Sequence, residues 1–262
     1  MLIQFSFKNY KSFKEEATLD LSATKMTEFS ERVVTIGSEK ILPVAAIYGA
    51  NASGKSNIYN AFGYMSNYVS ESFKYGDEDE KFEEFSPTSF LFDSKSINDE
   101  SSFEVYFTLP DDKTEKVFNY GFCINKEGVT EEWLNSKVKT ARKYSTVFYR
   151  GKTADELDLS GIPKSSRENI NVALEKQVLI VSLGAKLKID KCKVIRDWFL
   201  ANEFADFGNP FTNFFLSRRL PKGFVEDKSV QQKIIDYFSS FDEHIKDFRI
   251  EKVPLEGETK EE

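Results

Sequence analysis

Apolar and polar positions alternate in several segments of the first half of the chain. Ile3, Phe5 and Phe7 alternate with polar residues near the start, and the same period of two recurs in 103–109 and 118–124. A period of two indicates strands that bury one face. The last two runs are separated by a Pro-Asp-Asp segment, which is typical of a turn, so we predict an antiparallel hairpin there.

Three shorter segments are also predicted as strands, namely 18–21, 146–150 and 248–252. Residues 42–48 have a different pattern, because Leu-Pro-Val-Ala-Ala-Ile-Tyr is a continuous run of small and apolar residues. Such a run is typical of a strand that is covered on both faces. We therefore expect 42–48 to lie inside a mostly parallel sheet.

Helical periodicity begins directly after Ser56. The apolar residues that follow it recur at intervals of three and four and predict a helix of about four to five turns: Ile58, Ala61, Phe62, Met65, Val69 and Phe73. Residues 155–170 are polar and are expected to form a loop that enters a helix. The remainder is predicted to be largely helical, with two apolar faces: Ile195, Trp198 and Phe199 on one, and Val230, Ile234, Phe238 and Phe241 on the other.

These patterns predict an α/β chain with three regions. Residues 1–75 would hold the N-terminal strands and the first helix. Residues 76–152 would hold an antiparallel β-subdomain, and 153–262 a mainly helical region. The second region opens with the acidic stretch 76–84, which we interpret as a solvated loop, with an anionic partner-binding surface as the alternative.

Composition excludes a generally basic nucleic-acid coat, because 36 Lys and Arg stand against 43 Asp and Glu and the net charge is -7. One local segment, 137–143, is basic and is a candidate nucleic-acid contact. The 25 Phe lie mainly in the alternating runs. They are therefore expected in half-buried strands rather than in a ligand-binding aromatic box.

Cysteine and histidine are too few to support a metal site or a disulfide framework. Cys123 and Cys192 lie far apart in the sequence, and His244 is the single histidine. The start of the chain predicts a strand and not a signal peptide, and no apolar run approaches the ~20 residues needed to cross a bilayer. We therefore expect a reduced, soluble, cytoplasmic protein without membrane association.

One motif carries specific chemistry. The segment Gly49-Ala50-Asn51-Ala52-Ser53-Gly54-Lys55-Ser56 fits the G-x-x-x-x-G-K-S/T pattern of a phosphate-binding loop. It follows an apolar run and opens a predicted amphipathic helix, which is the context that the motif requires. Glycines let consecutive backbone N–H groups point inward, and the helix N-terminus adds partial positive charge. The ligand that fits such a loop is a polyphosphate.

Two side chains of the loop have predicted roles. Lys55 would place a point charge on the β- and γ-phosphates and is the catalytic candidate, and the Ser56 hydroxyl would complete the coordination of Mg²⁺. ATP and Mg²⁺ are therefore the predicted cofactors, although the sequence leaves the choice between ATP and GTP open.

The segment 5–13, Phe-Ser-Phe-Lys-Asn-Tyr-Lys-Ser-Phe, followed by 47–57, resembles the ABC-type ATPase heads of the SMC, RecF and OLD-like group. It is more similar still to the AAA-family ATPases of bacterial abortive-infection and phage-defence systems. The resemblance implies a P-loop NTPase fold, the N-terminal lobe of an ABC-type head. It also implies that Lys11, Ser12 and Asn57 join the loop in nucleotide binding, and Asn51 is typical of these heads.

Such a head also needs a Walker B strand that ends in Asp and Glu, and a signature motif. Residues 159–163 and 178–181 imitate the spacing of these two motifs, but Ser182 and Leu183 stand where the carboxylates should be. We therefore interpret the chain as the N-terminal portion of such an ATPase. It is expected to bind ATP with little or no hydrolysis, to form a homodimer through the nucleotide head when complete, and to act on an effector protein or nucleic acid.

Two other functions fit the same loop. A P-loop kinase for a small molecule would need a lid rich in arginine, for which Arg218 and Arg219 are candidates. A non-catalytic interaction module would use ATP only as a structural ligand. Partner binding that survives Lys55→Ala would favour that module.

Overall fold

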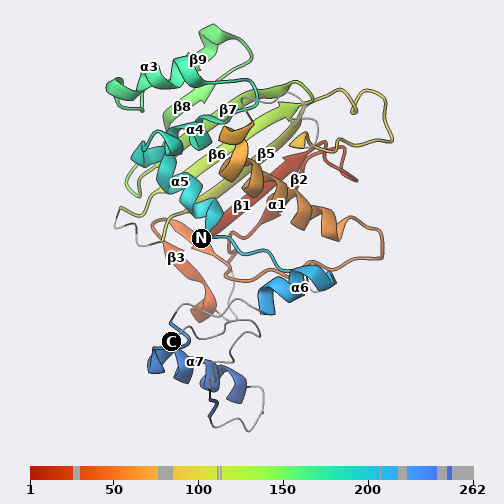
Figure 1. Ribbon diagram of the computed structural model, residues 1–262, viewed down its shortest axis with the longest axis vertical. Helices are drawn as coiled ribbons and strands as arrows, with labels where there is room; N and C mark the ends of the chain where they lie inside the picture. The colour runs from red at the N-terminus through yellow and green to blue at the C-terminus, as the bar shows by residue number, and fades with distance from the viewer. Residues whose placement is uncertain are drawn as a thin grey trace, which may run out of the picture. The chain divides into compact units, whose positions relative to one another are not determined.

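The computed structural model describes residues 1–25, 30–75, 85–110, 112, 114–206, 208–217, 223–240 and 247–249. The chain divides into two compact units, Met1–Glu203 and Phe204–Glu262. Figure 1 shows the sheet and helices of the first unit. The acidic stretch 76–84, the arginine pair at 218–219 and His244 lie outside the described residues.

The strands of the first unit form a seven-stranded sheet and a separate two-stranded one, with the orders β2-β1-β5-β6-β7-β8-β9 and β3-β4. Every pairing in both sheets is antiparallel. The bounds are β1 Leu2–Lys8, β2 Ala17–Asp20, β3 Val34–Ile36, β4 Glu39–Ile41, β5 Ser101–Thr108, β6 Val117–Asn125, β7 Gly128–Lys137, β8 Ser145–Arg150 and β9 Leu157–Asp158. The expectation of a mostly parallel sheet was therefore wrong.

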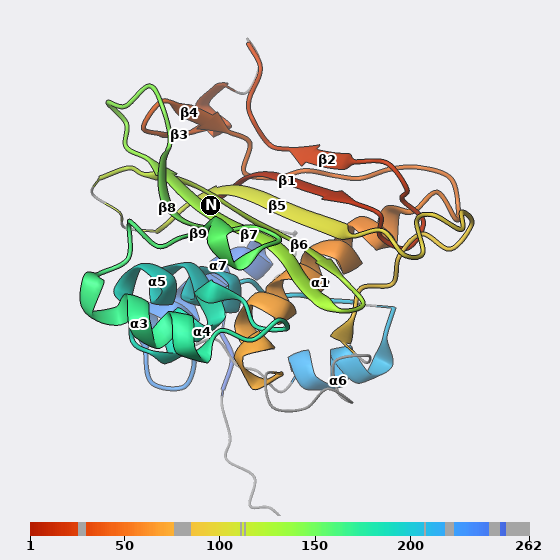
Figure 2. The same ribbon diagram turned by 90° about the horizontal axis from the view of Figure 1, so that it is seen from above.

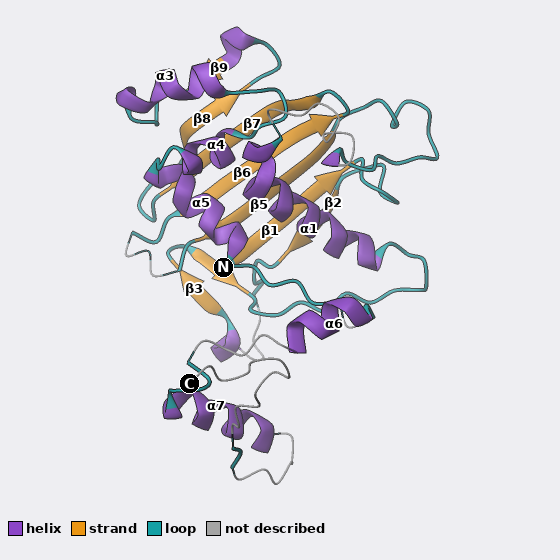
Figure 3. Ribbon diagram, viewed as in Figure 1, coloured by secondary structure: helices purple, strands orange, loops and turns teal. Residues whose placement is uncertain are grey.

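The first unit has four α-helices among its described residues and three short 3₁₀ segments. The helices are α1 Lys55–Glu71, α3 Lys164–Ala173, α4 Ile180–Lys186 and α5 Asp190–Leu200, and the 3₁₀ segments are Ser30–Arg32, Ser72–Lys74 and Ala154–Glu156. Figure 3 separates these helices from the strands by colour. No helix in the described part of the chain combines the length and apolarity that crossing a membrane requires.

The alternating runs form the strands that they predict. β5 and β6 pair as the expected hairpin, with Phe103 opposite Phe122 and Phe107 opposite Phe118. β1 joins the other edge of β5, so strands from the first and second predicted regions share one sheet. The boundaries of the three predicted regions stay a prediction.

The core lies between one face of the large sheet and the helices α1, α4 and α5. Figure 2 shows these helices on a single side of the sheet. Aromatic and aliphatic residues of the strands pack there in one cluster with residues of α1 and α5. Trp198 of α5, for example, stacks on Phe107 of β5 with ring centroids 4.1 Å apart. The phenylalanines of the strands are thus core residues, as the alternation indicates.

The segment 42–48 is not a strand, contrary to expectation. It has no regular secondary structure, and Val44 and Tyr48 are 77% and 90% exposed. A strand buried on both faces needs neighbours at both edges, and no described strand pairs with this segment. Its first N–H, that of Leu42, donates to the carbonyl of Leu21, and Pro43 then lacks an N–H.

A buried carboxylate fixes α4 on the sheet. Glu132 of β7 is 0% exposed and accepts hydrogen bonds from the N–H groups of Ile180, at 2.6 Å, and Val181, at 3.1 Å. Tyr120 of β6 donates its hydroxyl to the same carboxylate at 3.1 Å. Glu132 thereby satisfies N–H groups at the start of the helix that have no partner within it.

The two segments that imitate a signature and a Walker B strand have other structures. Residues 178–181 contain the first two residues of α4 and no strand, and 159–163 form a turn that leads into α3. The carbonyl oxygens of that turn accept hydrogen bonds from Arg167 and Lys191. These two segments therefore resemble a signature and a Walker B strand only in their spacing along the sequence.

The second unit contains α6 Pro210–Ser217 and α7 Lys228–Ser239. The Asp227 carboxylate caps α7 by accepting the N–H of Ser229 at 2.7 Å. Helix α7 carries the predicted apolar face up to Phe238. The predicted strand at 248–252 is absent at 247–249, and its remaining residues lie outside the described part of the chain.

Glu132 makes stability depend on pH. Burial raises the pKa of this carboxyl from 4.5 to about 7, so the folded state binds a proton that the unfolded state has released between these values. The free energy of unfolding contributed by this group is therefore full below pH 4.5 and falls as pH rises to 7. The loss is at most about 3 kcal/mol.

Glu132→Gln should remove this pH dependence, because an amide does not titrate in this range, although its single oxygen can accept only one of the two N–H groups that bond to separate carboxylate oxygens. We expect the variant to gain stability relative to the parent between pH 5 and 8, measured by urea denaturation. Glu131→Gln, at the neighbouring and partly exposed position, is the control and should leave the pH dependence unchanged. Parallel stability curves for the parent and Glu132→Gln would contradict the assignment.

Candidate functional site

The glycine-rich loop 49–56 connects the irregular segment 42–48 to α1, which begins at Lys55. Gly54 precedes the helix with φ 94° and ψ 4°. That φ lies in the left-handed region, which glycine adopts without strain. The predicted helix after the loop is confirmed. The left-handed backbone conformation of Gly54 turns the chain from the loop into this helix.

The side chain of Lys55 folds back over the loop. Its ammonium donates hydrogen bonds to the carbonyl oxygens of Gly49, at 2.7 Å, and Ala50, at 2.6 Å. A Cβ on Gly49 would lie 2.8 Å from the Ser53 hydroxyl oxygen, so a side chain there would crowd the loop. The loop therefore holds one positive charge at its centre and leaves no room for a larger residue at its start.

The backbone of the loop offers further donors. The N–H of Ser53 donates to the carbonyl of Ala50 at 3.2 Å. The N–H groups of Asn51, Ala52 and Gly54 have no hydrogen-bond partner among the described residues. Exposed N–H groups beside a helix N-terminus and an ammonium form a site for an anion with several oxygens.

The turn after β1 lies against the loop. A Cβ on Gly54 would lie 2.9 Å from the hydroxyl oxygen of Ser12 and 2.9 Å from the ring of Phe13. Asn57 in the first turn of α1 donates its side-chain amide to the Ser12 hydroxyl at 2.8 Å. The structure thus brings Ser12 and Asn57, which are 45 positions apart, to one side of the loop.

Lys11 lies in the same turn but has other contacts. Its N–H donates to the carbonyl of Thr88 at 2.7 Å, and its ammonium lies 5.6 Å from the centre of the Tyr10 ring. These contacts place the backbone of Lys11 against the segment before β5. A nucleotide contact by Lys11 stays a prediction.

Asn9 fixes this turn, and the sequence analysis did not single it out. Its side chain is 3% exposed, and its amide nitrogen donates to the carbonyl of Ser96 at 2.8 Å. The amide oxygen accepts the N–H of Phe90 at 3.1 Å. The backbone of Asn9 has φ 52°, which Asn tolerates better than most residues. Its place before Tyr-Lys-Ser in the N-terminal motif is the signal that could have identified it.

Ser56 is exposed in the first turn of α1, and its hydroxyl has no partner in the described part of the chain. The described residues contain no group of three His, Cys, Asp or Glu that could hold a metal ion alone. The hydroxyl fits a magnesium ion whose other ligands are phosphate oxygens and waters. Ser56 could therefore supply one ligand of a magnesium ion, and the bound phosphates and waters would supply the others.

A comparison with protein families identifies a family that matches most of the chain. The family described as "AAA domain, putative AbiEii toxin, Type IV TA system" matches residues 44–252, which include the complete loop, α1 and the strands β5 to β9. The turn after β1 lies before the matched residues. No curated protein matches the chain.

Gly54→Ala tests the packing of the loop against the turn. We expect a loss of about 1–2 kcal/mol in the free energy of unfolding, because alanine is strained at φ 94° and its methyl group would meet Ser12 and Phe13. Gly63→Ala, inside α1, is the matched control and should be neutral or stabilising. Equal effects of the two substitutions, measured by thermal and urea denaturation, would refute this packing.

Proposed function

The chain belongs to the family described as "AAA domain, putative AbiEii toxin, Type IV TA system", and from that premise we propose that it binds ATP and Mg²⁺ through the loop 49–56. The family match confirms the resemblance to ATPases of abortive-infection systems. It supports a P-loop ATPase domain in general terms. The nucleotide, the metal and the residues that hold them are the proposal.

The observation that carries the proposal is the arrangement of Lys55 in its loop. The ammonium is held over the loop by two carbonyl oxygens, 2.7 and 2.6 Å away, beside N–H groups that lack partners among the described residues. A triphosphate would accept hydrogen bonds from these N–H groups. Lys55 would then neutralise the β- and γ-phosphates.

Ser12 and Asn57 extend the site on one side of the loop. Their mutual hydrogen bond of 2.8 Å fixes the Ser12 hydroxyl next to Gly54. We propose that this pair positions the nucleotide from the N-terminal turn, and that Ser56 binds Mg²⁺ together with the β- and γ-phosphates. The layout of an ABC-type head, in which such a turn faces the nucleotide, is part of the same proposal.

We further propose that this chain alone hydrolyses ATP slowly. Hydrolysis requires a carboxylate to orient the attacking water. None of the hydrogen bonds and ion pairs of the described loop residues involves Asp or Glu, and 178–181 begins a helix instead of a Walker B strand. Binding without turnover is therefore the expected behaviour.

Exposed apolar residues adjoin the loop and support nucleotide-dependent association. Val44, Ile47 and Tyr48 are 77%, 42% and 90% exposed and lead directly into Gly49. Burying such residues against a second chain would be favourable. We propose a homodimer formed through this face, which switches an effector protein when ATP binds.

Lys55→Ala should weaken ATP binding strongly. We expect the dissociation constant measured by calorimetry in Mg²⁺ to rise at least about 30-fold, because a charge-assisted contact to phosphate is lost. Lys193→Ala, on the exposed surface of α5, is the control and should bind ATP like the parent. Turnover should be negligible in all three proteins. Lys55-dependent hydrolysis would refute the slow-hydrolysis proposal, and phosphate transfer to an added acceptor would favour a kinase.

Ser56→Ala should act only through magnesium. We expect ATP binding in Mg²⁺ to weaken about tenfold, and binding in EDTA to stay unchanged, because the hydroxyl serves the metal and not the phosphates directly. Ser53→Ala in the same loop is the matched control and should keep the response to Mg²⁺. An equal loss in Mg²⁺ and in EDTA would show that Ser56 does not bind the metal.

A further inference from the structure

A cavity of about 470 Å³ lies at the end of the large sheet away from any residue of the loop 49–56. It is open to solvent and is lined by the turn between β6 and β7, the end of β8 and the segment that follows α3. This volume lies within the range of roughly 300–1,000 Å³ that is usual for small-ligand sites. Its lining shares no residue with the proposed nucleotide site.

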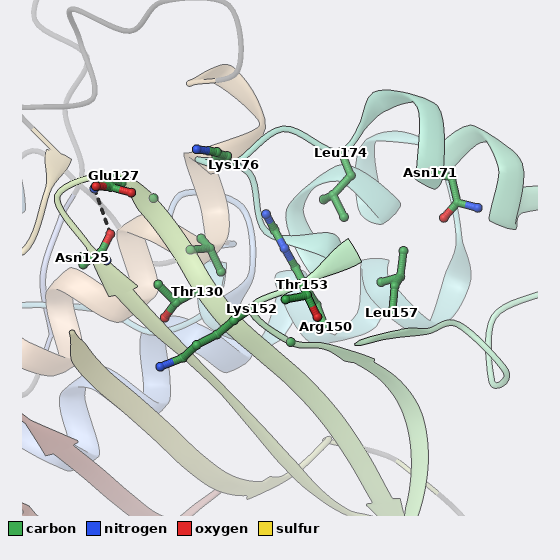
Figure 4. Close-up of a pocket in the computed structure, with 13 residues that line it drawn as sticks. Asn125, Glu127, Thr130, Arg150, Lys152, Thr153, Leu157, Asn171, Leu174 and Lys176 are labelled. Carbon is green, nitrogen blue, oxygen red and sulfur yellow. Dashed lines mark hydrogen bonds between the residues drawn. The ribbon is translucent and has the colours of Figure 1, made fainter. Parts of the chain in front are cut away.

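The lining has a cationic side and an apolar side. Figure 4 shows Lys152 and Lys176 on the side of the β6–β7 turn, and Leu157 and Leu174 on the side of α3, with Arg150 between the two groups. Asn171 lies beyond the leucines on the α3 side. A ligand with an anionic group and a ring or an apolar part would meet both kinds of surface.

Positive side chains are concentrated at this cavity, although the chain as a whole is acidic. The cavity is lined by three cationic residues, Arg150, Lys152 and Lys176, and by one carboxylate, Glu127, whereas the whole chain has a net charge of -7. Because exposed charges are screened beyond about 8 Å in physiological salt, the local cations decide what the cavity attracts. They favour an anion.

Not all of this charge is compensated by the protein. Lys152 pairs with the Glu100 carboxylate at 3.2 Å, and Arg150 donates to the carbonyl oxygens of Val178, at 2.8 Å, and Glu175, at 3.3 Å. In contrast, the ammonium of Lys176 has no polar partner among the described residues. The Lys176 ammonium is therefore available to a ligand.

The cavity is formed before any ligand arrives. The Val129 N–H donates to the carbonyl of Lys176 at 2.8 Å, which ties the segment after α3 to β7. Gly128 approaches this carbonyl so closely that a Cβ would lie 2.7 Å from it. Arg150 holds the same segment on both sides of Lys176, through its contacts with the carbonyl oxygens of Glu175 and Val178. A preformed cavity spares the ligand the cost of ordering its walls.

We propose that this cavity binds a small phosphate-bearing molecule of the size of a nucleoside monophosphate. Its phosphate accepts hydrogen bonds from Lys176 and Lys152, with Arg150 beside it, and its ring or apolar part packs against Leu157 and Leu174. Phosphate suits this site because several separate donors can each reach one of its oxygens. The proposal does not depend on the function of the loop 49–56.

The test uses the full chain with Lys55→Ala, so that the loop does not bind the probes. Adenosine monophosphate and inorganic pyrophosphate are titrated by calorimetry into this protein at two salt concentrations. Lys176→Glu reverses the free charge of the cavity, and Lys193→Glu makes the same change of net charge on the exposed surface of α5. Asn171→Trp fills the cavity without changing charge, and Val172→Trp adds the same ring at the next position of α3, which is 76% exposed and does not line the cavity.

We expect Lys176→Glu and Asn171→Trp each to weaken binding of adenosine monophosphate at least tenfold, and the two controls to bind like the Lys55→Ala protein. Binding of pyrophosphate should be weakened by Lys176→Glu and less by Asn171→Trp, because pyrophosphate has no ring that must fit into the cavity. Absence of binding by both probes at millimolar concentration would overturn the proposal. The proposal would also be overturned if each cavity variant and its control, Lys176→Glu with Lys193→Glu and Asn171→Trp with Val172→Trp, lost the same amount of binding. A single-stranded oligonucleotide that binds through Lys176 when neither small probe does would assign the cavity to nucleic acid instead.

Discussion

The buried Glu132 carboxylate is the contact on which the helical side of the first unit depends. It joins β7 to the first N–H groups of α4, and α4 in turn holds the 3₁₀ segment that directly follows α1, because the hydroxyl of Ser182 accepts the N–H of Phe73 at 3.1 Å. A carboxylate without solvent is costly unless donors surround it, and here two N–H groups and the Tyr120 hydroxyl do so. The sheet therefore positions α4, and α4 positions the C-terminal end of α1.

The opposite end of α1 is fixed by a different set of contacts. Asn57 bonds to Ser12, and the turn that contains Ser12 is held by the buried side chain of Asn9. A helix that is anchored at both ends presents its N-terminus at a constant place relative to the sheet. This explains how the loop can keep a defined shape although the segment before it, 42–48, is exposed and irregular. Preorganisation of this kind is what an anion-binding loop requires.

Sequence reasoning found the local features and missed those that depend on partners. The alternation in 103–109 and 118–124 predicted strands and their hairpin, and the spacing after Ser56 predicted α1, because both patterns are set by the burial of one face. The run 42–48 has the composition of a buried strand, but burial requires neighbouring strands that no local pattern can supply. Glu132 was missed for the same reason, since one glutamate in a strand gives no sign of the helix that it will cap. Lys55 and Ser56 lie at the start of α1, as the spacing predicted, whereas their roles and their ligands rest on the motif and stay proposals.

Net charge is a poor guide to what this chain binds. An acidic total of -7 argues against a basic coat over the whole surface, yet charges separated by more than about 8 Å act almost independently in physiological salt. The loop holds Lys55 beside N–H groups and the start of a helix, and no carboxylate bonds to its described residues. At the cavity, Glu100 compensates Lys152 but not Lys176. Each place therefore has a cation that the protein does not pair with a carboxylate, and this local charge, more than the total of -7, decides whether an anion binds there.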